Sequence, residues 1–231
     1  LREQMPSISQ VHIATPEQRL GLNELAAVGR EWLGADSEAC EKFERIARNA
    51  GVKTRHFCLP SEEILALNGM RRRAQLFEEQ GVRMLSQALN PALQETQASE
   101  VGHLIFTSCS APLIPSIDAA FVLESKLSPH VARIPIFQQG CAGGVVALGL
   151  AAKLARLGRP VAVSAGELCS LVFQPSDTSG SQLVGAAIFG DGAAGLVVEP
   201  QAGGLQILGS SSYLVPHSRH LMGYDIFDDG F

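Results

Sequence analysis

One cysteine, Cys141, stands in a glycine-rich turn, residues 140–144 (GCAGG), between two apolar runs. Residues 133–137 before the turn predict a buried strand, and residues 145–155 after it predict a buried central helix, apolar nearly all round. At the start of such a helix, a cysteine lies beside unpaired backbone N–H groups and the positive end of the helix dipole, and both favour a thiolate. The glycines allow a carbonyl group to approach the backbone, as an oxyanion hole requires. The pattern predicts a nucleophile; the alternative is that Cys141 is a small buried apolar side chain.

A basic cluster forms a second candidate site. Lys42, Arg45 and Arg48 recur on neighbouring turns of a helix predicted over residues 37–49. Basic side chains at this spacing can clamp the phosphates of a nucleotide-bearing substrate. They can equally form an ordinary solvated helix face, so both interpretations stay open.

The composition narrows the class of protein. The 231 residues carry a net charge of −5 and are 46% hydrophobic, as in a soluble globular protein, and the acidic balance argues against general nucleic-acid binding. No apolar run reaches the ~18 residues of a membrane span, and the N-terminus lacks the apolar core of a signal peptide, so we expect a cytoplasmic protein without a membrane partner. The five cysteines form no CxxC pair and the six histidines no ligand spacing, so we expect neither a disulfide framework nor a metal site.

The remaining elements are predicted from periodicity and from turn residues. We expect strands over residues 7–14, 101–107, 160–165 and 190–199. We expect helices over residues 21–32, 37–49 and 71–89. Two further helices are expected to begin at Ser61, as N-cap, and at Ser116 or Asp118. The helix over residues 71–89 is predicted to break at Asn90-Pro91. Glycines in the Gly190-Asp191-Gly192 turn have no phosphate-loop spacing and indicate close packing. Strands and helices alternate, which predicts an α/β fold.

Three segments together resemble a known family. The motifs QQGCAGG, GELCSLVFQPSDT and LVGAAIFGDGAAGLVVE occur in an order and at a spacing similar to those of type III polyketide synthases, the chalcone-synthase-like members of the thiolase superfamily. The resemblance runs from about Pro6 to the last residue, and Cys169 in its setting is more similar to bacterial members. It implies a thiolase-like, layered αβαβα fold. It also implies iterative decarboxylative condensation of malonyl-CoA onto an acyl-CoA starter, with no cofactor other than these CoA thioesters and with a homodimer as the assembly.

The resemblance also implies a division of the chain. We expect residues 1–6 to be disordered or non-native, residues 7–200 to form the N-terminal thiolase-like domain, and residues 201–231 to begin the C-terminal domain. The chain ends without a terminal helix or polar tail, so we expect further sequence to follow. The histidine and asparagine that assist the cysteine in this family would lie in that remainder, and none of the six histidines present stands in a matching motif.

Site residues follow from the resemblance position by position. Cys141 matches the nucleophile that carries the starter and the growing chain. Lys42 and Arg45 match residues that contact the CoA phosphates; a third basic position falls on Asn49, for which Arg48 would substitute. Positions that line the substrate cavity fall on Cys109, Ser110, Glu167, Cys169 and Val172, with Leu205 near a gatekeeper position. Ile114 matches a residue that reaches across the dimer interface.

Other interpretations remain for these residues and for the whole chain. Cys109 and Cys169 also fit ordinary buried cysteines, and Glu167 could hydrogen-bond pocket backbone rather than touch substrate. The chain could be a truncated, non-catalytic half-protein that acts as a dimerisation or binding module. It could also be a condensing enzyme like ketoacyl-ACP synthase III, which shares the Gly-Asp-Gly turn and the helix-borne cysteine but does not predict the PSD segment.

Overall fold

The computed structural model describes residues 5–110, 113–201, 203–218 and 220–224. They fall into two compact units. The sheet unit comprises the described positions within residues 5–14, 78–167 and 193–224, and the helical unit comprises residues 15–77 and 168–192. Each unit is described by itself.

A mixed sheet of seven strands forms the centre of the sheet unit, in the order β6-β5-β7-β8-β1-β9, with β2 paired to β8. The strands are β1 (Ser7–Ile8), β2 (His12–Ala14), β5 (His103–Ser108), β6 (Ala132–Phe137), β7 (Val161–Leu168), β8 (Asp191–Glu199) and β9 (Leu205–Gln206). β5 pairs in parallel with both β6 and β7, whereas β1 and β2 run antiparallel to β8. The carboxyl ends of three neighbouring strands therefore meet at one edge of the sheet.

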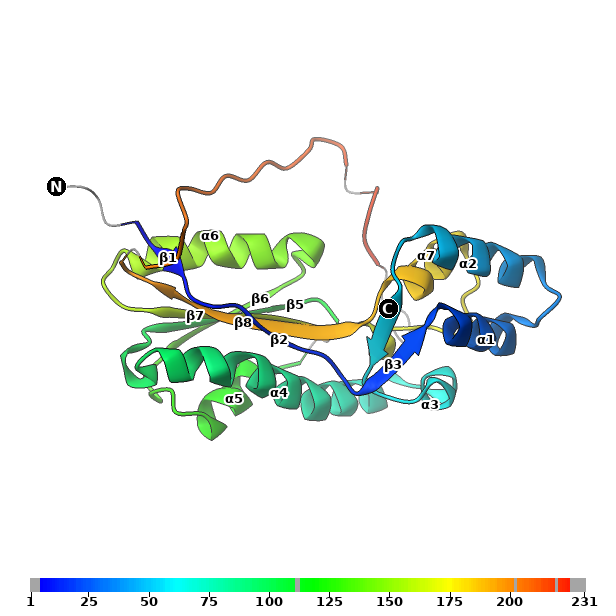
Figure 1. Ribbon diagram of the computed structural model, residues 1–231, viewed down its shortest axis with the longest axis horizontal. Helices are drawn as coiled ribbons and strands as arrows, with labels where there is room; N and C mark the ends of the chain where they lie inside the picture. Colours follow the sequence, from blue (N-terminus) through cyan, green and yellow to red (C-terminus); the bar gives the residue numbers. More distant parts are fainter. Residues whose placement is uncertain (1–4, 111–112, 202, 219, 225–231) are drawn as a thin grey trace. The chain divides into compact units, whose positions relative to one another are not determined.

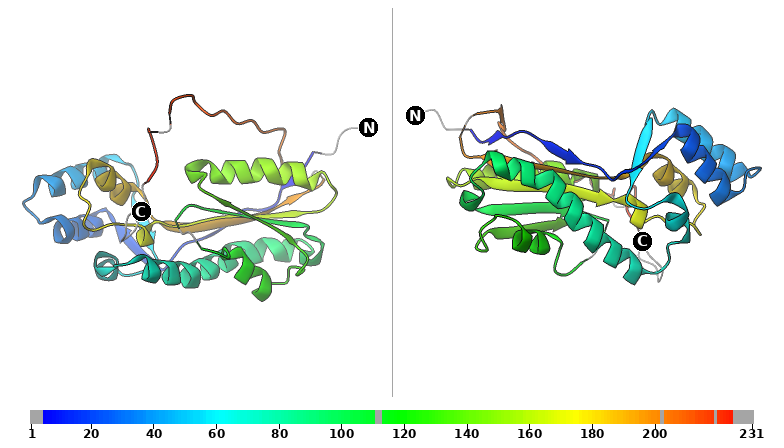
Figure 2. Two further views of the ribbon diagram at one scale, coloured as in Figure 1. Left: turned by 180° about the vertical axis from the view of Figure 1, so that it is seen from behind. Right: turned by 60° about the horizontal axis from the view of Figure 1, so that its bottom comes forward.

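Helices cover both faces of this sheet (Figure 1; Figure 2). Helix α6 (Gly143–Ala155) lies on one face, and α5 (Asp118–Glu124) lies on the other with the part of α4 (Met70–Glu95) from Glu78 onward. Small residues allow close packing: a Cβ on Gly195 of β8 would lie 2.6 Å from the carbonyl oxygen of Ala88 on α4. The buried residues between α6 and the sheet are Ile105, Ala147, Ala151, Ala155, Val161, Val163, Leu196 and Val198. Two short 3₁₀ turns, η1 (Ala98–Glu100) and η2 (Gly140–Ala142), complete the unit.

Three predictions about these elements were wrong in part. Helix α4 does not break at Asn90-Pro91 but continues to Glu95, because Ala92 and Leu93 extend its buried face and outweigh the lost hydrogen bond. The strand over 133–137 is not buried, because β6 is an edge strand. The α6 helix is not buried all round: Val145 is 71% exposed.

The helical unit packs its helices around a small core of its own. Its elements are the antiparallel strands β3 (Gln18–Gly21) and β4 (Thr54–Phe57), the helices α1 (Leu22–Leu33), α2 (Glu38–Asn49), α3 (Ser61–Ala66) and α7 (Gly180–Ile188), and the turn η3 (Cys169–Leu171). The residues Leu25, Phe43, Ala47, Leu183 and Ala187 join α1, α2 and α7 in one buried cluster. Ser37 is the N-cap of α2, one residue before the helix predicted from that position begins, whereas the residue that caps α3 is Pro60 and not the predicted Ser61.

The segment predicted to begin a second domain contacts the sheet unit. Strand β9 pairs with β1, and the N–H of Ile207 donates to the carbonyl of Pro6 at 2.9 Å. Pro6 is thus part of the folded structure, while residues 1–4 of the predicted disordered segment lie outside the described residues. Apolar side chains beyond β9 are exposed, namely Leu208, Tyr213, Leu214, Val215, Leu221 and Met222. The boundary at 200/201 stays a prediction.

Asp191 links three segments of the helical unit from a buried position. Its carboxylate accepts hydrogen bonds from the N–H of Cys58 at 2.7 Å, the N–H of Ser170 at 2.8 Å and the hydroxyl of Ser170 at 2.6 Å. Burial raises the pKa of Asp191, and the hydrogen bonds from Ser170 and Cys58 oppose that shift. Because the carboxylate accepts from donors of two other segments, it holds η3 and the residue after β4 at the start of β8.

We therefore predict that Asp191→Ala lowers the free energy of unfolding by about 2–4 kcal/mol, because it leaves buried donors unsatisfied. Urea denaturation followed by circular dichroism measures the change. Asp36→Ala, at an exposed aspartate of the same unit, is the matched control and should change it by less than about 0.5 kcal/mol. Equal stability of the two variants would contradict the structural role of Asp191.

Candidate active site

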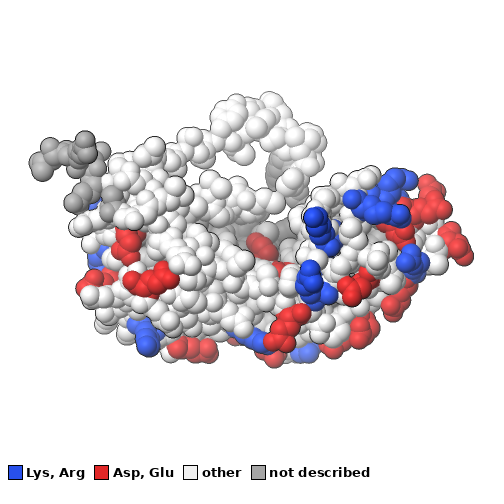
Figure 3. Space-filling view, viewed as in Figure 1, with Lys and Arg blue, Asp and Glu red and all other residues white. Residues whose placement is uncertain are grey.

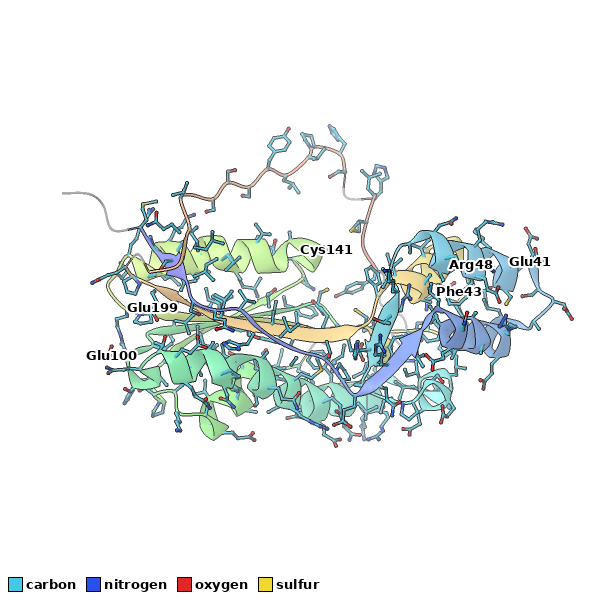
Figure 4. The ribbon with its side chains drawn as sticks, viewed as in Figure 1. Glu41, Phe43, Arg48, Glu100, Cys141 and Glu199 are labelled. Atoms are coloured by element: carbon cyan, nitrogen blue, oxygen red, sulfur yellow. The ribbon has the colours of Figure 1, made fainter. Side chains whose placement is uncertain are left out.

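Cys141 lies in the 3₁₀ turn η2, between the end of β6 and the start of α6, and its side chain is exposed (Figure 4). Two residues between the end of β6 and Cys141 have a left-handed backbone conformation, namely Gln138 with φ 68° and Gly140 with φ 54°. Glycine adopts this conformation without steric cost, whereas glutamine does so at about 1 kcal/mol. The strained turn ends β6 sharply and presents the cysteine immediately before the helix, close to its predicted place.

Gly143 sets how closely the start of α6 approaches the sheet. A Cβ on Gly143 would collide with Oγ1 of Thr107, a buried residue of β5. Only a residue without a side chain fits at this point of closest approach. Because Gly143 has no side chain, the first turn of α6 can pack directly against β5, and this places Cys141 just before the helix.

The ends of β5 and β6 bring a second cysteine near Cys141. Ser108 at the end of β5 is opposite Phe137 at the end of β6, so the residues that follow both strands share one edge. Cys109 follows directly, and it lies close enough to Cys141 for a charge on Cys141 to raise the pKa of the Cys109 thiol.

Glu167, near the end of β7, binds the loop that follows β5. Its carboxylate accepts from the N–H groups of Cys109 and Ser110 at 2.9 and 3.0 Å, from the hydroxyl of Ser108 at 3.2 Å and from the hydroxyl of Ser110. The Cys109 thiol also donates to Glu167 Oε1 at 3.4 Å. Of the two interpretations left open for Glu167, the structure shows the hydrogen bonds to backbone.

The environment of Cys109 disfavours a thiolate. Burial, the charge of Glu167 and the hydrogen bond to Glu167 raise the pKa of Cys109 to about 12. Tyr224 lies close to Cys109 and Glu167: burial and the charges of these two residues raise the pKa of its phenol. Sequence reasoning missed Tyr224, and a lone tyrosine near the end of a polar stretch offered no signal for it.

The basic cluster is exposed on α2 of the helical unit. Arg48 is engaged by Glu44, with Nη2 to Oε2 at 2.6 Å, whereas the side chains of Lys42 and Arg45 form no ion pair within the described part of the chain. Lys42 lies at the N-terminus of α7, since a Cβ on Gly180 would be 3.3 Å from Nζ of Lys42. A helix N-terminus and an unpaired lysine together attract anions.

The remaining predicted site residues are described within their own units. Cys169 and Val172 are partly buried in η3 and just after it, in the helical unit. Leu205 is 74% exposed on β9, at the opposite edge of the sheet from β6. Ile114 is fully exposed in the loop before α5.

Neither a metal cluster nor a membrane span is found in the described ranges. Among residues 5–110, 113–201, 203–218 and 220–224, no three His, Cys, Asp or Glu side chains are grouped so as to hold a metal ion. Within the same residues, each helix is too short or too polar to cross a membrane.

Comparison with known proteins places the chain in a family. Residues 10–201 match the family described as chalcone and stilbene synthases, N-terminal domain. Phloroglucinol synthase of Pseudomonas fluorescens is 31% identical over 98% of this chain and 66% of its own length. The 1,3,6,8-tetrahydroxynaphthalene synthase of Streptomyces griseus is 30% identical over 98% of this chain and 62% of its own. The chain thus spans slightly less than two thirds of the length of these relatives.

A solved structure shows the same fold. The 1,3,6,8-tetrahydroxynaphthalene synthase of Streptomyces coelicolor, a bacterial type III polyketide synthase, superposes with a TM-score of 0.91 and 28% identity over 97% of this chain and 66% of that one. This confirms the predicted thiolase-like α/β fold and the similarity to bacterial members. The chain belongs to the chalcone and stilbene synthase family, the type III polyketide synthases, and contains the N-terminal domain of that family.

Proposed function

We propose that the chain supplies the nucleophile and the CoA-binding residues of a type III polyketide synthase. The substrates are an acyl-CoA starter and malonyl-CoA, and the assembly is a homodimer. The observation that carries the proposal is the exposed Cys141 on the glycine turn before α6, in a chain of this family. The family match does not favour a carrier-protein-dependent synthase or a non-catalytic module.

The proposed chemistry begins with acyl transfer. The Cys141 thiolate attacks the thioester carbonyl of the starter, a bond forms between Cys141 Sγ and the acyl carbon, and the CoA thiolate leaves. Loss of CO₂ from malonyl-CoA then supplies the carbon nucleophile that attacks this new thioester and releases Cys141. The resemblance assigns a histidine and an asparagine to these steps, and none of the six histidines of the chain stands in a matching motif.

The other residues have roles of binding and shape in this proposal. Lys42 and Arg45 hold the CoA phosphates, helped by the N-terminus of α7, while Arg48 is already paired with Glu44. For the wall of the cavity that holds the growing chain, the resemblance assigns Cys109, Ser110 and Glu167 of the sheet unit and Cys169 and Val172 of the helical unit. Ile114 contacts the second subunit, which its full exposure permits.

We predict that Cys141→Ala abolishes the covalent acyl adduct formed from an acyl-CoA, because every other cysteine among the described residues is buried or partly buried. Intact-protein mass spectrometry before and after addition of a medium-chain acyl-CoA measures the adduct. Cys40→Ala, a buried cysteine of α2, is the control and should retain it. An adduct of normal yield in Cys141→Ala would sink the assignment of the nucleophile.

Replacing Lys42 and Arg45 together by Ala should raise KM for CoA esters about tenfold or more and change kcat less, because phosphate contacts bind substrate and transition state alike. Steady-state kinetics with acyl-CoA measures both constants. The matched control is the double variant Arg71→Ala/Arg72→Ala, which removes the same charge from exposed residues of the same unit. If both double variants shift KM equally, the effect is one of net charge and the clamp is refuted.

Gly143→Ala should slow acylation of Cys141 by about tenfold or more, because the added methyl group meets Thr107 and displaces the start of α6. Stopped-flow or quench mass spectrometry follows the adduct over time. Gly144→Ala is the control, since a Cβ there meets nothing within 4 Å. Equal rates in the two variants would show that the approach of α6 to β5 does not position the nucleophile.

A further inference from the structure

Two cysteines share one edge of the sheet, yet they differ in surroundings. Cys141 is exposed on its turn, whereas Cys109 is partly buried and donates its thiol hydrogen to Glu167. Both follow neighbouring parallel strands, β6 and β5. If both sulfurs were nucleophilic, an acyl group could form a thioester on either one.

Among the described residues, three groups lie close to Cys109. Glu167 faces it from β7, Cys141 from η2, and Tyr224 from the last described segment. Within the described residues, the charges that act on Cys109 are those of Glu167 and Cys141, and both oppose a thiolate there. No cation that would favour one contributes among these residues.

We propose that Glu167 silences Cys109: by holding the thiol as a neutral hydrogen-bond donor, it leaves Cys141 as the single site of acylation. Cys109 then forms part of the cavity wall without competing for the acyl group. This assignment rests on the proposed synthase function for the identity of the acyl group, whereas the protection of the thiol rests on its hydrogen bond to Glu167 and on the charge of that residue.

Silencing matters because an acyl group can move between thiols. A Cys109 thiolate would attack the carbonyl of the Cys141 thioester, forming a bond from Cys109 Sγ to the acyl carbon and expelling the Cys141 thiolate. The chain would then be held on a partly buried sulfur, away from the turn that loads it. When the pKa of a thiol is raised to about 12, only about one molecule in ten thousand is ionised to the thiolate near pH 8.

The opposite role, in which Glu167 would act as a base that activates Cys109, fits the contacts less well. The carboxylate already accepts hydrogen bonds from the N–H groups of Cys109 and Ser110 and from the hydroxyls of Ser108 and Ser110. Both carboxylate oxygens are thus already occupied as acceptors, which places Glu167 as an acceptor for the thiol rather than as a base that removes its proton.

The test measures the reactivity of each thiol separately. Protein with and without Glu167→Gln is treated with iodoacetamide at about pH 8, and peptide mass spectrometry gives the alkylation rate at Cys109 and at Cys141. Glutamine keeps an oxygen for the backbone N–H groups but removes the charge, so we expect the rate at Cys109 to rise about tenfold or more relative to that at Cys141. A base role for Glu167 predicts a fall instead.

Ser110→Ala is the matched control, because it removes one hydroxyl from the cluster and leaves the carboxylate beside Cys109. Its Cys109 should stay as unreactive as in the unaltered protein. An unchanged or lower rate at Cys109 in Glu167→Gln, or an equal rise in Ser110→Ala, overturns the proposal.

A second measurement decides the matter if Glu167→Gln does not fold. In Cys141→Ser protein, the alkylation rate at Cys109 should still be rising near pH 10, whereas a plateau with a midpoint near 9 or below overturns the proposal. Alkylation needs no acyl-CoA, so a failure of the synthase function shows separately, as the absence of an acyl adduct on Cys141 in the unaltered protein.

Discussion

The parallel pairing of β5 with β6 and with β7 is the constraint on which the candidate site depends. It sets Ser108 opposite Phe137 and brings the end of β7 to the same edge, so three loops that are far apart in the sequence meet. Each loop contributes a different kind of group: a thiol on a strained turn, a pair of small polar residues, and a carboxylate that binds their backbone. A shift of the pairing register by one residue would turn every side chain of a strand to the other face of the sheet, and these groups would no longer lie together.

Absent side chains position the nucleophile as much as present ones do. Gly143 lets α6 begin against Thr107, and Gly140 permits the left-handed turn before Cys141. The helix is therefore built from small residues on its inner face, and Val145 is left exposed on the other. On the face shown in Figure 3, the surface over α6 is almost free of charged side chains, whereas basic and acidic side chains are frequent over α1 and α2.

Much of this could be predicted from the sequence, because local signals dominate where they agree. The helix predicted over residues 37–49 is found as α2, and the turn at Cys141 is visible from its glycines. The errors arose where distant packing overrides a local rule: Pro91 is tolerated since the buried face of α4 continues beyond it. The partners of Glu167 and the place of Tyr224 depend on which strands become neighbours, and no periodicity contains that information.

Gly195 belongs to a sequence motif that reflects helix–sheet packing rather than chemistry. It lies in the run from Gly190 to Glu199, where the backbone of β8 comes so close to Ala88 of α4 that not even a methyl group would fit. Sequence drift at this position is thus limited by the spacing of two backbones and not by a reaction. A motif of this kind identifies a way of packing a helix on a sheet, and it will recur in any protein that packs so, whatever chemistry its cysteine turn performs.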